Sequence, residues 1–268
     1  MTEENRADAT RMPATYITHG GGPCFFMEWD PPDAWDELRA ALEGIAPSLP
    51  SRPTAILAVT AHWEAPVVTV GSGASPGLIY DYGGFPPHTY ELTYPAPGEP
   101  GVAARVHDLL TGAGIESRLD PERGWDHGVF VPLKVMFPDA DVPVVAMSLR
   151  QDLDPAAHLA VGRALRPLRD EGVLIVGSGS SFHNFAHFGS PLAKPFDDWL
   201  NEVVVAPAAE REAALARWEE APYARIAHGR EEHLLPLMVA AGAADDVPAR
   251  TFFRGPVLGT PMSCWFFD

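Results

Sequence analysis

Residues 55–64 read AILAVTAHWE, a stretch that joins a strand signal to a histidine. Residues 55–59 form a short apolar run with β-branched members, which is typical of a strand buried on both faces of a parallel sheet. His62 comes shortly after that run. Ligands of α/β sheets bind in the crevice outside the carboxyl ends of the strands. We therefore expect a parallel sheet that presents His62 at its ligand-binding edge.

Two other stretches repeat this layout. Residues 14–18 are apolar and lead to His19 and three consecutive glycines, whereas residues 173–176 lead through GSGSS to His183. Glycines allow the backbone to turn sharply and to approach a ligand closely. Three strands that each deliver a histidine predict one metal site at a common edge of the sheet. The alternative is that the three histidines are ordinary turn residues.

The rest of the chain alternates strand and helix signals, which indicates an α/β protein. Asp154 and Pro155 form a strong helix start, and Pro167 predicts a kink in that helix. We predict a single α/β domain over residues 13–268, with a mostly parallel central sheet flanked by helices, after a flexible N-terminal tail over residues 1–12. The other expected elements are strands at 67–70, 115–119, 143–149 and within 251–267, and helices at 33–45, 101–110, 154–170 and within 191–241, the last of them at 231–241 with His233 in its first turn.

Charge and cysteine content narrow the class of protein. The chain has 36 acidic and 19 basic side chains, a net charge of −17, which argues against nucleic acids and anionic membranes as partners. No signal peptide and no apolar run of membrane-spanning length is visible. Cys24 and Cys264 lack metal-motif spacing, so we expect a reduced, cytoplasmic protein. A disulfide between the two cysteines is the alternative.

Residues 71–100 are rich in glycine and proline and also carry several aromatic side chains, among them Tyr80, Tyr82, Phe85, Tyr90 and Tyr94. A long irregular stretch in a compact domain is usually a functional loop or a linker. Two interpretations stay open: a loop that closes over a flat substrate, and a loop that is merely anchored on the core by its aromatic residues.

Two more histidines have acidic neighbours. His127 stands in the sequence DHG, where Asp126 is expected to orient its ring, and His233 follows Glu231 and Glu232. Imidazoles with carboxylates and no thiolates suit zinc or ferrous iron. Nucleophile-elbow, P-loop and dinucleotide motifs are missing from the sequence, and a serine nucleophile in GSGSS beside His183 is an alternative. The histidines interpreted as structural or solvated are His88, His107, His158, His187 and His228.

Several motifs together resemble the class III extradiol ring-cleavage dioxygenases, in particular the DOPA 4,5-dioxygenase-like branch. The motifs occur in family order and span almost the whole chain. They are THGGGP (18–23), AHWE (61–64), IYDYGGFPPHTYELTYPAPGEP (79–100), WDHGVFVPLKVMFPDADVPVVAMSL (125–149), VLIVGSGSSFHN (173–184) and EEHLLPLMVAAGAA (231–244).

The resemblance implies a metal-dependent enzyme of aromatic compound catabolism that cleaves a catechol ring beside its diol with O2. It implies that His19, His62 and His233 bind the metal, with His183 as a further ligand or as the acid/base. His127 would hydrogen-bond substrate or oxygen. The wider class has two histidines and a glutamate as ligands, whereas a histidine stands at the third position here. Ferrous iron is the expected catalytic ion, and zinc is an alternative in purified protein.

Other functions remain open at this stage. A protein of the same fold can bind or signal without oxygenase activity, and the same ligand set in a zinc hydrolase would activate water. The expected partners are a small aromatic diol and O2, with neither nucleic acid nor membrane. The sequence is compatible with a homo-oligomer as well as with a monomer.

Overall fold

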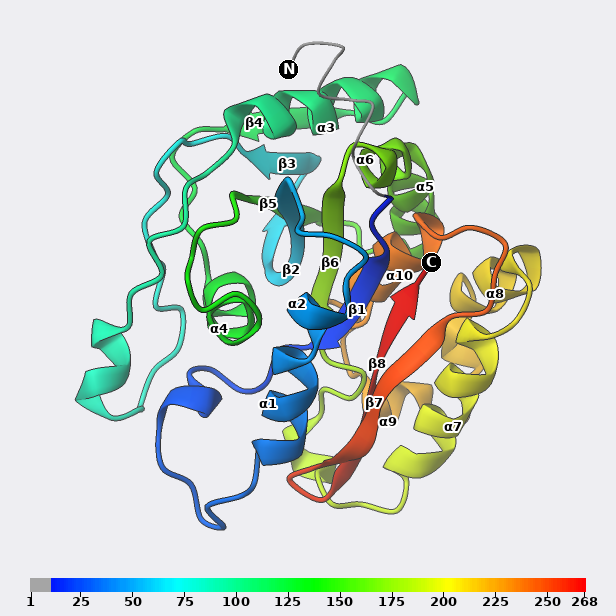
Figure 1. Ribbon diagram of the computed structural model, residues 1–268. Coiled ribbons are helices and arrows are strands. Elements are labelled where there is room, and N and C mark those ends of the chain that lie inside the picture. Colours follow the sequence, from blue (N-terminus) through cyan, green and yellow to red (C-terminus); the bar gives the residue numbers. More distant parts are fainter. Residues whose placement is uncertain (1–10) are drawn as a thin grey trace.

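The computed structural model describes residues 11–268, so the tail predicted over residues 1–12 lies almost entirely outside the described residues. Within them, one eight-stranded sheet has the order β4-β3-β5-β2-β6-β1-β8-β7 (Figure 1). The central strands β1, β6, β2 and β5 pair in parallel, whereas β8 and β7 form an antiparallel edge. The predicted α/β fold with a mostly parallel central sheet is confirmed. The strands are β1 (Ala14–Thr18), β2 (Ala55–Ala65), β3 (Val68–Gly71), β4 (Ser117–Asp120), β5 (Val144–Arg150), β6 (Val173–Gly179), β7 (Arg250–Val257) and β8 (Thr260–Phe267).

Two adjacent residues of β6 show which helices cover each face of the sheet. A Cβ atom built on Gly177 would lie 2.3 Å from the carbonyl oxygen of Pro236, in helix α10 (Leu235–Gly242). The hydroxyl of Ser178 donates a hydrogen bond to the carbonyl of Gly128, in helix α4 (His127–Met136). Adjacent side chains of a strand point to opposite faces, so α10 and α4 cover opposite sides. Cover on both sides explains why every residue of β6 is buried.

Most helices lie within the predicted segments, and prolines set some of their boundaries. The helix predicted over residues 33–45 is shorter, from Asp36 to Glu43, and a separate short helix begins at Ile45. Asp154 caps α5 by accepting a hydrogen bond from the backbone N–H of Ala157 (3.0 Å), with Pro155 at the first helical position, as predicted. The kink expected at Pro167 is a full break, because a separate short helix begins there. The helices are α1 (Asp36–Glu43), α2 (Ile45–Ser48), α3 (Pro100–Gly112), α4, α5 (Pro155–Leu165), α6 (Pro167–Asp170), α7 (Ala193–Val204), α8 (Ala208–Leu215), α9 (Ala224–Ala227) and α10, with 3-10 turns at Cys24–Phe26, Pro87–Glu91, Phe185–His187 and Trp218–Glu220.

The strand that carries His62 is longer than expected. β2 continues to Ala65, so His62 lies inside the strand, and the expectation that it follows the strand end was wrong. The pairing of β2 with β5 shifts register between Val59 and Glu64. Such an irregularity bends a strand and re-aims its side chains. The apolar pattern ended at Val59 because Thr60, His62 and Glu64 in the outer part of β2 are polar, and His62 lines a cavity instead of packing in the core.

Two further expectations concern the cysteines and the membrane. Cys24 and Cys264 are both free and buried, so the disulfide alternative is wrong. The Sγ atom of Cys264 instead accepts a hydrogen bond from the backbone N–H of Thr18 (3.2 Å). No helix within residues 11–268 is long and apolar enough to span a bilayer.

Candidate active site

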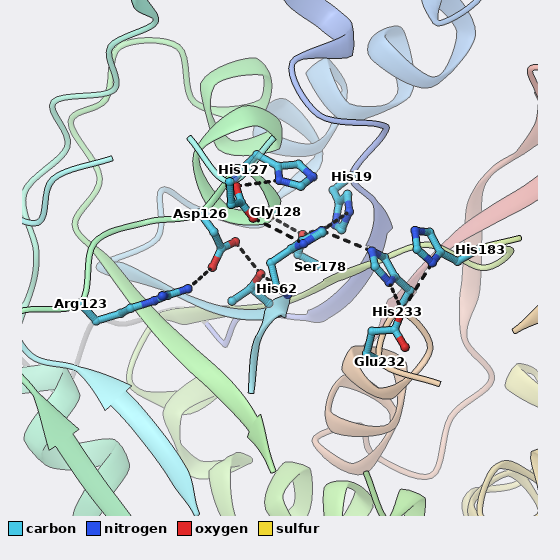
Figure 2. Close-up of polar contacts among 12 residues, drawn as sticks. His19, His62, Arg123, Asp126, His127, Gly128, Ser178, His183, Glu232 and His233 are labelled. Atoms are coloured by element: carbon cyan, nitrogen blue, oxygen red, sulfur yellow. Dashed lines mark hydrogen bonds and ion pairs between the residues drawn. The ribbon is translucent and has the colours of Figure 1, made fainter. Parts of the chain in front are cut away.

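Three histidines meet at the edge of the sheet where β1 and β6 end (Figure 2). The Nε2 atom of His62 lies 3.2 Å from Nε2 of His19 and 3.3 Å from Nε2 of His233. One ring nitrogen from each histidine lies within 4.8 Å of the other two, which is close enough for a shared metal ion. His19 directly follows β1. His233 precedes α10, which begins at Leu235, and so does not lie in the first helical turn as expected.

A hydrogen-bond relay sets the ring of His19. Nδ1 of His19 lies 3.0 Å from the hydroxyl oxygen of Ser178, and that hydroxyl donates its only proton to the carbonyl of Gly128. Nδ1 must therefore donate to Ser178, which leaves Nε2 of His19 without a proton. This tautomer turns a lone pair toward the other two histidines.

Glu232 orients His233 and lies near His183. Nδ1 of His233 lies 2.9 Å from Oε1 of Glu232, and Nδ1 of His183 lies 3.5 Å from the same oxygen. The rings of His183 and His233 stack with centroids 3.4 Å apart. His183 therefore lies beside the three-histidine cluster, and its group of close donor atoms contains Glu232 and His233 rather than His19 and His62.

The histidines of the cluster are held in the neutral form. Burial, with the neighbouring imidazoles acting in the same direction, lowers the pKa of His62 to about 2 and that of His19 well below its usual value. Burial also lowers the pKa of His233 to about 4, although Glu232 acts in the opposite direction. Metals bind only neutral imidazole, so the donor set fits a divalent metal of the zinc or iron type at neutral pH.

Asp81, rather than the predicted Asp126, orients His127. Nδ1 of His127 lies 2.8 Å from Oδ1 of Asp81, which also accepts the backbone N–H of His127 (2.9 Å). The second oxygen of Asp81 lies 3.5 Å from Nδ1 of His62. Burial would raise the pKa of Asp81, but the hydrogen bonds from His127 outweigh it and lower the pKa. The carboxylate thus stays charged and holds two of the histidines.

The expected role of Asp126 was wrong because its side chain turns away from His127. Asp126 accepts a hydrogen bond from the hydroxyl of Thr60 (2.7 Å) and another from Arg123 (3.0 Å). The same Thr60 oxygen accepts the backbone N–H of His62 (3.1 Å). Asp126 therefore ties the start of α4 to the outer part of β2. Sequence neighbours at the start of a helix point in different directions, so adjacency did not imply contact.

A cavity of about 440 Å³ opens beside the histidines and is lined by His19, His62, His127, His183 and His233. Tyr82, Gly83 and Phe85 of the aromatic loop also line it. Other aromatic residues of the same loop serve as anchors: Tyr94 is buried near Trp125, with ring centroids 6.0 Å apart. One part of residues 71–100 is therefore anchored on the core, as one interpretation expected, whereas another part lines the cavity, and closure of the loop over a substrate stays a prediction.

The remaining histidines lie apart from the cavity, as predicted. His107 bonds to Ser117 (2.8 Å), His158 to the carbonyl of Asp154 (2.7 Å), and His228 to the carbonyl of Ser181 (3.1 Å). The serine alternative gains no support, because within residues 11–268 His183 makes no hydrogen bond to a serine side chain. Ser178 serves His19 instead.

Sequence reasoning missed Asp81 and Ser178. Asp81 stands in the motif IYDYGG, where the surrounding aromatic residues drew attention away from a carboxylate. Ser178 stands in GSGSS, which was weighed only as a source of nucleophiles. The available signals were a lone carboxylate among the aromatic residues of IYDYGG and a serine that is separated by a single glycine from the apolar run of residues 173–176.

Comparisons with known proteins point to one family. The family described as "Catalytic LigB subunit of aromatic ring-opening dioxygenase" matches residues 13–255. Dioxygenase tasH of Hapsidospora irregularis is 36% identical over 285 residues, covering 97% of this chain and 87% of its own. Among proteins named 4,5-DOPA dioxygenase extradiol, the one from Escherichia coli K12 is 34% identical over 262 residues (95% and 92% covered), and that from Beta vulgaris 42% over 203 residues (73% and 75%).

A solved structure extends the similarity to three dimensions. The crystal structure of an uncharacterized protein from Escherichia coli K12 superimposes with a TM-score of 0.79 at 29% sequence identity. The superposition covers 96% of this chain and 100% of the other. The similarity therefore includes the sheet and the edge where the histidines meet.

Proposed function

Because this chain belongs to the family of the catalytic LigB subunit of aromatic ring-opening dioxygenases, we propose that it cleaves the ring of a catechol-type substrate beside the diol, using O2 and one divalent metal. Both oxygen atoms would enter the product, and the catalytic domain would comprise residues 13–268. The observation that carries the proposal is the cluster of His19, His62 and His233, whose Nε2 atoms converge beside a cavity.

We assign His19, His62 and His233 as the metal ligands. Each has a partner for its other ring nitrogen: Ser178 for His19, Asp81 for His62 and Glu232 for His233. Such partners fix the ring orientation and raise the basicity of a ligand, and they accompany metal-binding histidines almost always. A cluster of three histidines without this support would be a weaker candidate.

His127 is proposed to act on the substrate. Asp81 accepts a hydrogen bond from Nδ1–H of His127, so Nε2 of His127 is an acceptor that can take a proton from a substrate hydroxyl. Its ring centroid lies 4.0 Å from that of His62, which puts the acceptor next to the proposed metal ligands. The charged Asp81 stabilises the imidazolium that forms.

His183 is proposed as an acid/base rather than a fourth ligand, although a ligand role was also expected. It lines the cavity, stacks on His233 and shares Glu232 with it. A proton on Nδ1 would be held by Glu232, which leaves Nε2 of His183 to exchange a proton during ring opening.

The donor set fits more than one ion. Ferrous iron, when bound, would lower the pKa of a coordinated substrate hydroxyl and supply the redox chemistry that O2 requires. Zinc prefers the same imidazole ligands and lies above iron in the usual order of affinity, so purified protein is expected to carry some zinc. Iron is the ion that we propose for turnover.

The decisive experiment separates the oxygenase from a zinc hydrolase and from a binding protein. The protein is stripped of metal, loaded anaerobically with ferrous iron or with zinc, and mixed with a panel of catechols in air-saturated buffer. An oxygen electrode and the yellow absorbance of a ring-opened semialdehyde are followed together. We expect O2 uptake and product in equal amounts with iron, and neither with zinc.

Two results would overturn the proposal. Iron-loaded protein that consumes no O2 with any catechol would favour a binding function. Hydrolytic activity with zinc alone, undiminished by an iron chelator, would favour the hydrolase. The variant His107→Ala is the matched control for histidine substitutions, because His107 lies on α3 and bonds only to Ser117 among the described residues.

A further inference from the structure

The cavity is lined by two main kinds of side chain. Histidines line the part proposed to hold the diol, and apolar side chains from four separate segments make up much of the remaining lining, together with glycines, Thr18, Tyr82 and Ser180. Trp29 and Trp35 follow β1, Phe85 belongs to the loop before η3 (Pro87–Glu91), and the segment after β6 supplies Phe185 and Phe188. Met262 of β8 completes this wall. We call these six residues the apolar wall.

Positive charge is missing from the cavity. Among residues 11–268, neither lysine nor arginine lines it. Basic side chains on adjoining segments are already engaged: Arg230 forms an ion pair with Glu64, Arg123 with Asp126 (3.0 Å), and Arg39 bonds to Glu43 (2.9 Å) and to the carbonyl of Phe25. A carboxylate in the cavity would therefore find no free cation.

The net charge of the whole protein also disfavours a substrate with a carboxylate. The chain has a net charge of −17, and an excess of negative charge lowers the local concentration of anions near its surface. A carboxylate placed against the apolar wall would also lose water without gaining a lysine or arginine partner from the lining, which is costly. A neutral substituent avoids both penalties.

We propose that the substrate is a catechol with an apolar, uncharged ring substituent, such as an alkyl or aryl group, rather than one with a carboxylate-bearing side chain. This inference rests on the ring-cleaving function proposed above and names its substrate class. It separates this chain from its relatives named for DOPA, an amino acid. The volume of about 440 Å³ lies within the range that holds a ring together with a substituent.

The first test compares substrates that share a carbon skeleton. 4-Propylcatechol and 3-(3,4-dihydroxyphenyl)propanoate differ only in a terminal methyl group against a carboxylate. With the iron-loaded enzyme we expect kcat/KM to be at least about tenfold higher for the propyl compound. Along the series methyl, ethyl and propyl, kcat/KM should rise about fourfold per methylene, as burial against an apolar wall predicts. Equal or higher kcat/KM for the carboxylate or for DOPA would overturn the inference.

A second test adds charge to the wall. Phe185 is 69% exposed, so it lies at the rim of the cavity and tolerates substitution. Phe185→Arg should raise kcat/KM for the propanoate relative to 4-propylcatechol about two- to fivefold, the range of an ion pair in contact with water. Val205→Arg is the control, because Val205 is 42% exposed at the end of α7 and does not line the cavity. An unchanged ratio in Phe185→Arg would count against the apolar wall as the specificity element.

A binding measurement distinguishes failure of this inference from failure of the proposed function. Zinc-loaded protein is titrated calorimetrically with both compounds, so that affinity is measured without turnover. Tighter binding of 4-propylcatechol without any O2 uptake by iron-loaded protein would support the substrate class and contradict the oxygenase. Faster ring cleavage of the propanoate than of 4-propylcatechol would support the oxygenase and contradict the substrate class. Equal affinities for the two compounds would overturn the inference whatever the activity.

Discussion

Asp81 Oδ1 lies 2.8 Å from Nδ1 of His127 and 2.9 Å from the backbone nitrogen of the same residue. One carboxylate oxygen therefore holds both the ring of His127 and the first turn of α4. The other oxygen lies 3.5 Å from Nδ1 of His62. A single side chain from the aromatic loop thus orients a proposed ligand and a proposed proton acceptor at once, which couples the position of that loop to the site.

We expect His127→Ala to keep its metal and to lose ring-cleaving activity by about 10²–10⁴-fold, the usual contribution of a general acid/base. The reason is that His127 stands outside the group of His19, His62 and His233: its own group of close donor atoms contains His62 and Asp81, and Asp81 already bonds to Nδ1 of His127. Metal content, melting temperature and turnover are measured on one preparation. Normal turnover with normal metal content would remove His127 from the mechanism.

Asp81→Asn should lower activity about 10–100-fold, because an amide cannot stabilise the imidazolium of His127 or fix its tautomer as a carboxylate does. Asp126→Asn is the matched control, since Asp126 is adjacent to His127 but bonds to Thr60 and Arg123. Asp126→Asn should mainly lower the free energy of unfolding and should affect kcat less. The reverse ranking of the two variants in kcat would contradict the orientation seen here.

Ser178→Ala should weaken metal affinity about 10–100-fold, because Nδ1 of His19 loses its acceptor and the ring is free to change tautomer. Affinity is measured by competition with a chelator of known strength. Ser148→Ala controls for the loss of a buried hydroxyl elsewhere in the sheet, on β5, where among the described residues the Ser148 hydroxyl bonds only to the backbone N–H of Thr69 (2.9 Å). Equal metal affinity in Ser178→Ala and wild type would show that the relay is unimportant.

The double variant His19→Ala, His62→Ala should bind no metal at the site, and full occupancy would refute the ligand assignment.

His228 should make the fold sensitive to acid. Burial lowers the pKa of His228 to about 3, whereas it is about 6.5 in an unfolded chain. The unfolded chain therefore takes up a proton that the folded state refuses, so stability is lost as the pH falls below 6.5 toward 3. Between pH 7.5 and 5 the loss from this one residue is about 2 kcal/mol, at 1.36 kcal/mol per pKa unit.

The measurement compares wild type with His228→Leu by urea unfolding at both pH values, with chelator present so that metal release does not contribute. At pH 7.5 the variant should be less stable by about 1–3 kcal/mol, since the carbonyl of Ser181 loses its donor. At pH 5 the difference should shrink by about 2 kcal/mol. A difference that does not depend on pH would mean that the pKa of His228 is the same in the folded protein as in the unfolded chain.

Gly22→Ala should destabilise the cavity wall. Gly22 has φ +54°, and a Cβ atom there would lie 2.8 Å from the ring of Phe85. The left-handed conformation alone costs a residue with a side chain about 1–2 kcal/mol, and the contact adds to it. Gly83→Ala is the control, because Gly83 also lines the cavity but its Cβ would meet nothing within 4 Å. Equal unfolding free energies for the two variants would contradict the described turn.

The amino-acid sequence by itself determined the α/β fold and the identity of the histidines that meet. Buried parallel strands leave long apolar runs, and a polar residue near the end of such a run stands out, as His19 and His62 do. Because the carboxyl ends of parallel strands share one edge, these residues had to lie near each other. His233 was found less directly, through the resemblance to a family.

Only the tertiary structure decided which groups hold those histidines. Asp81 and His127 are 46 residues apart, and Ser178 and His19 are 159 apart. Periodicity reports which residues are buried but not which distant partner a side chain meets, so the neighbour Asp126 was the only available candidate for His127. The charge-free wall of the cavity also needed the fold, because Trp35, Phe188 and Met262 come from segments that only packing brings together.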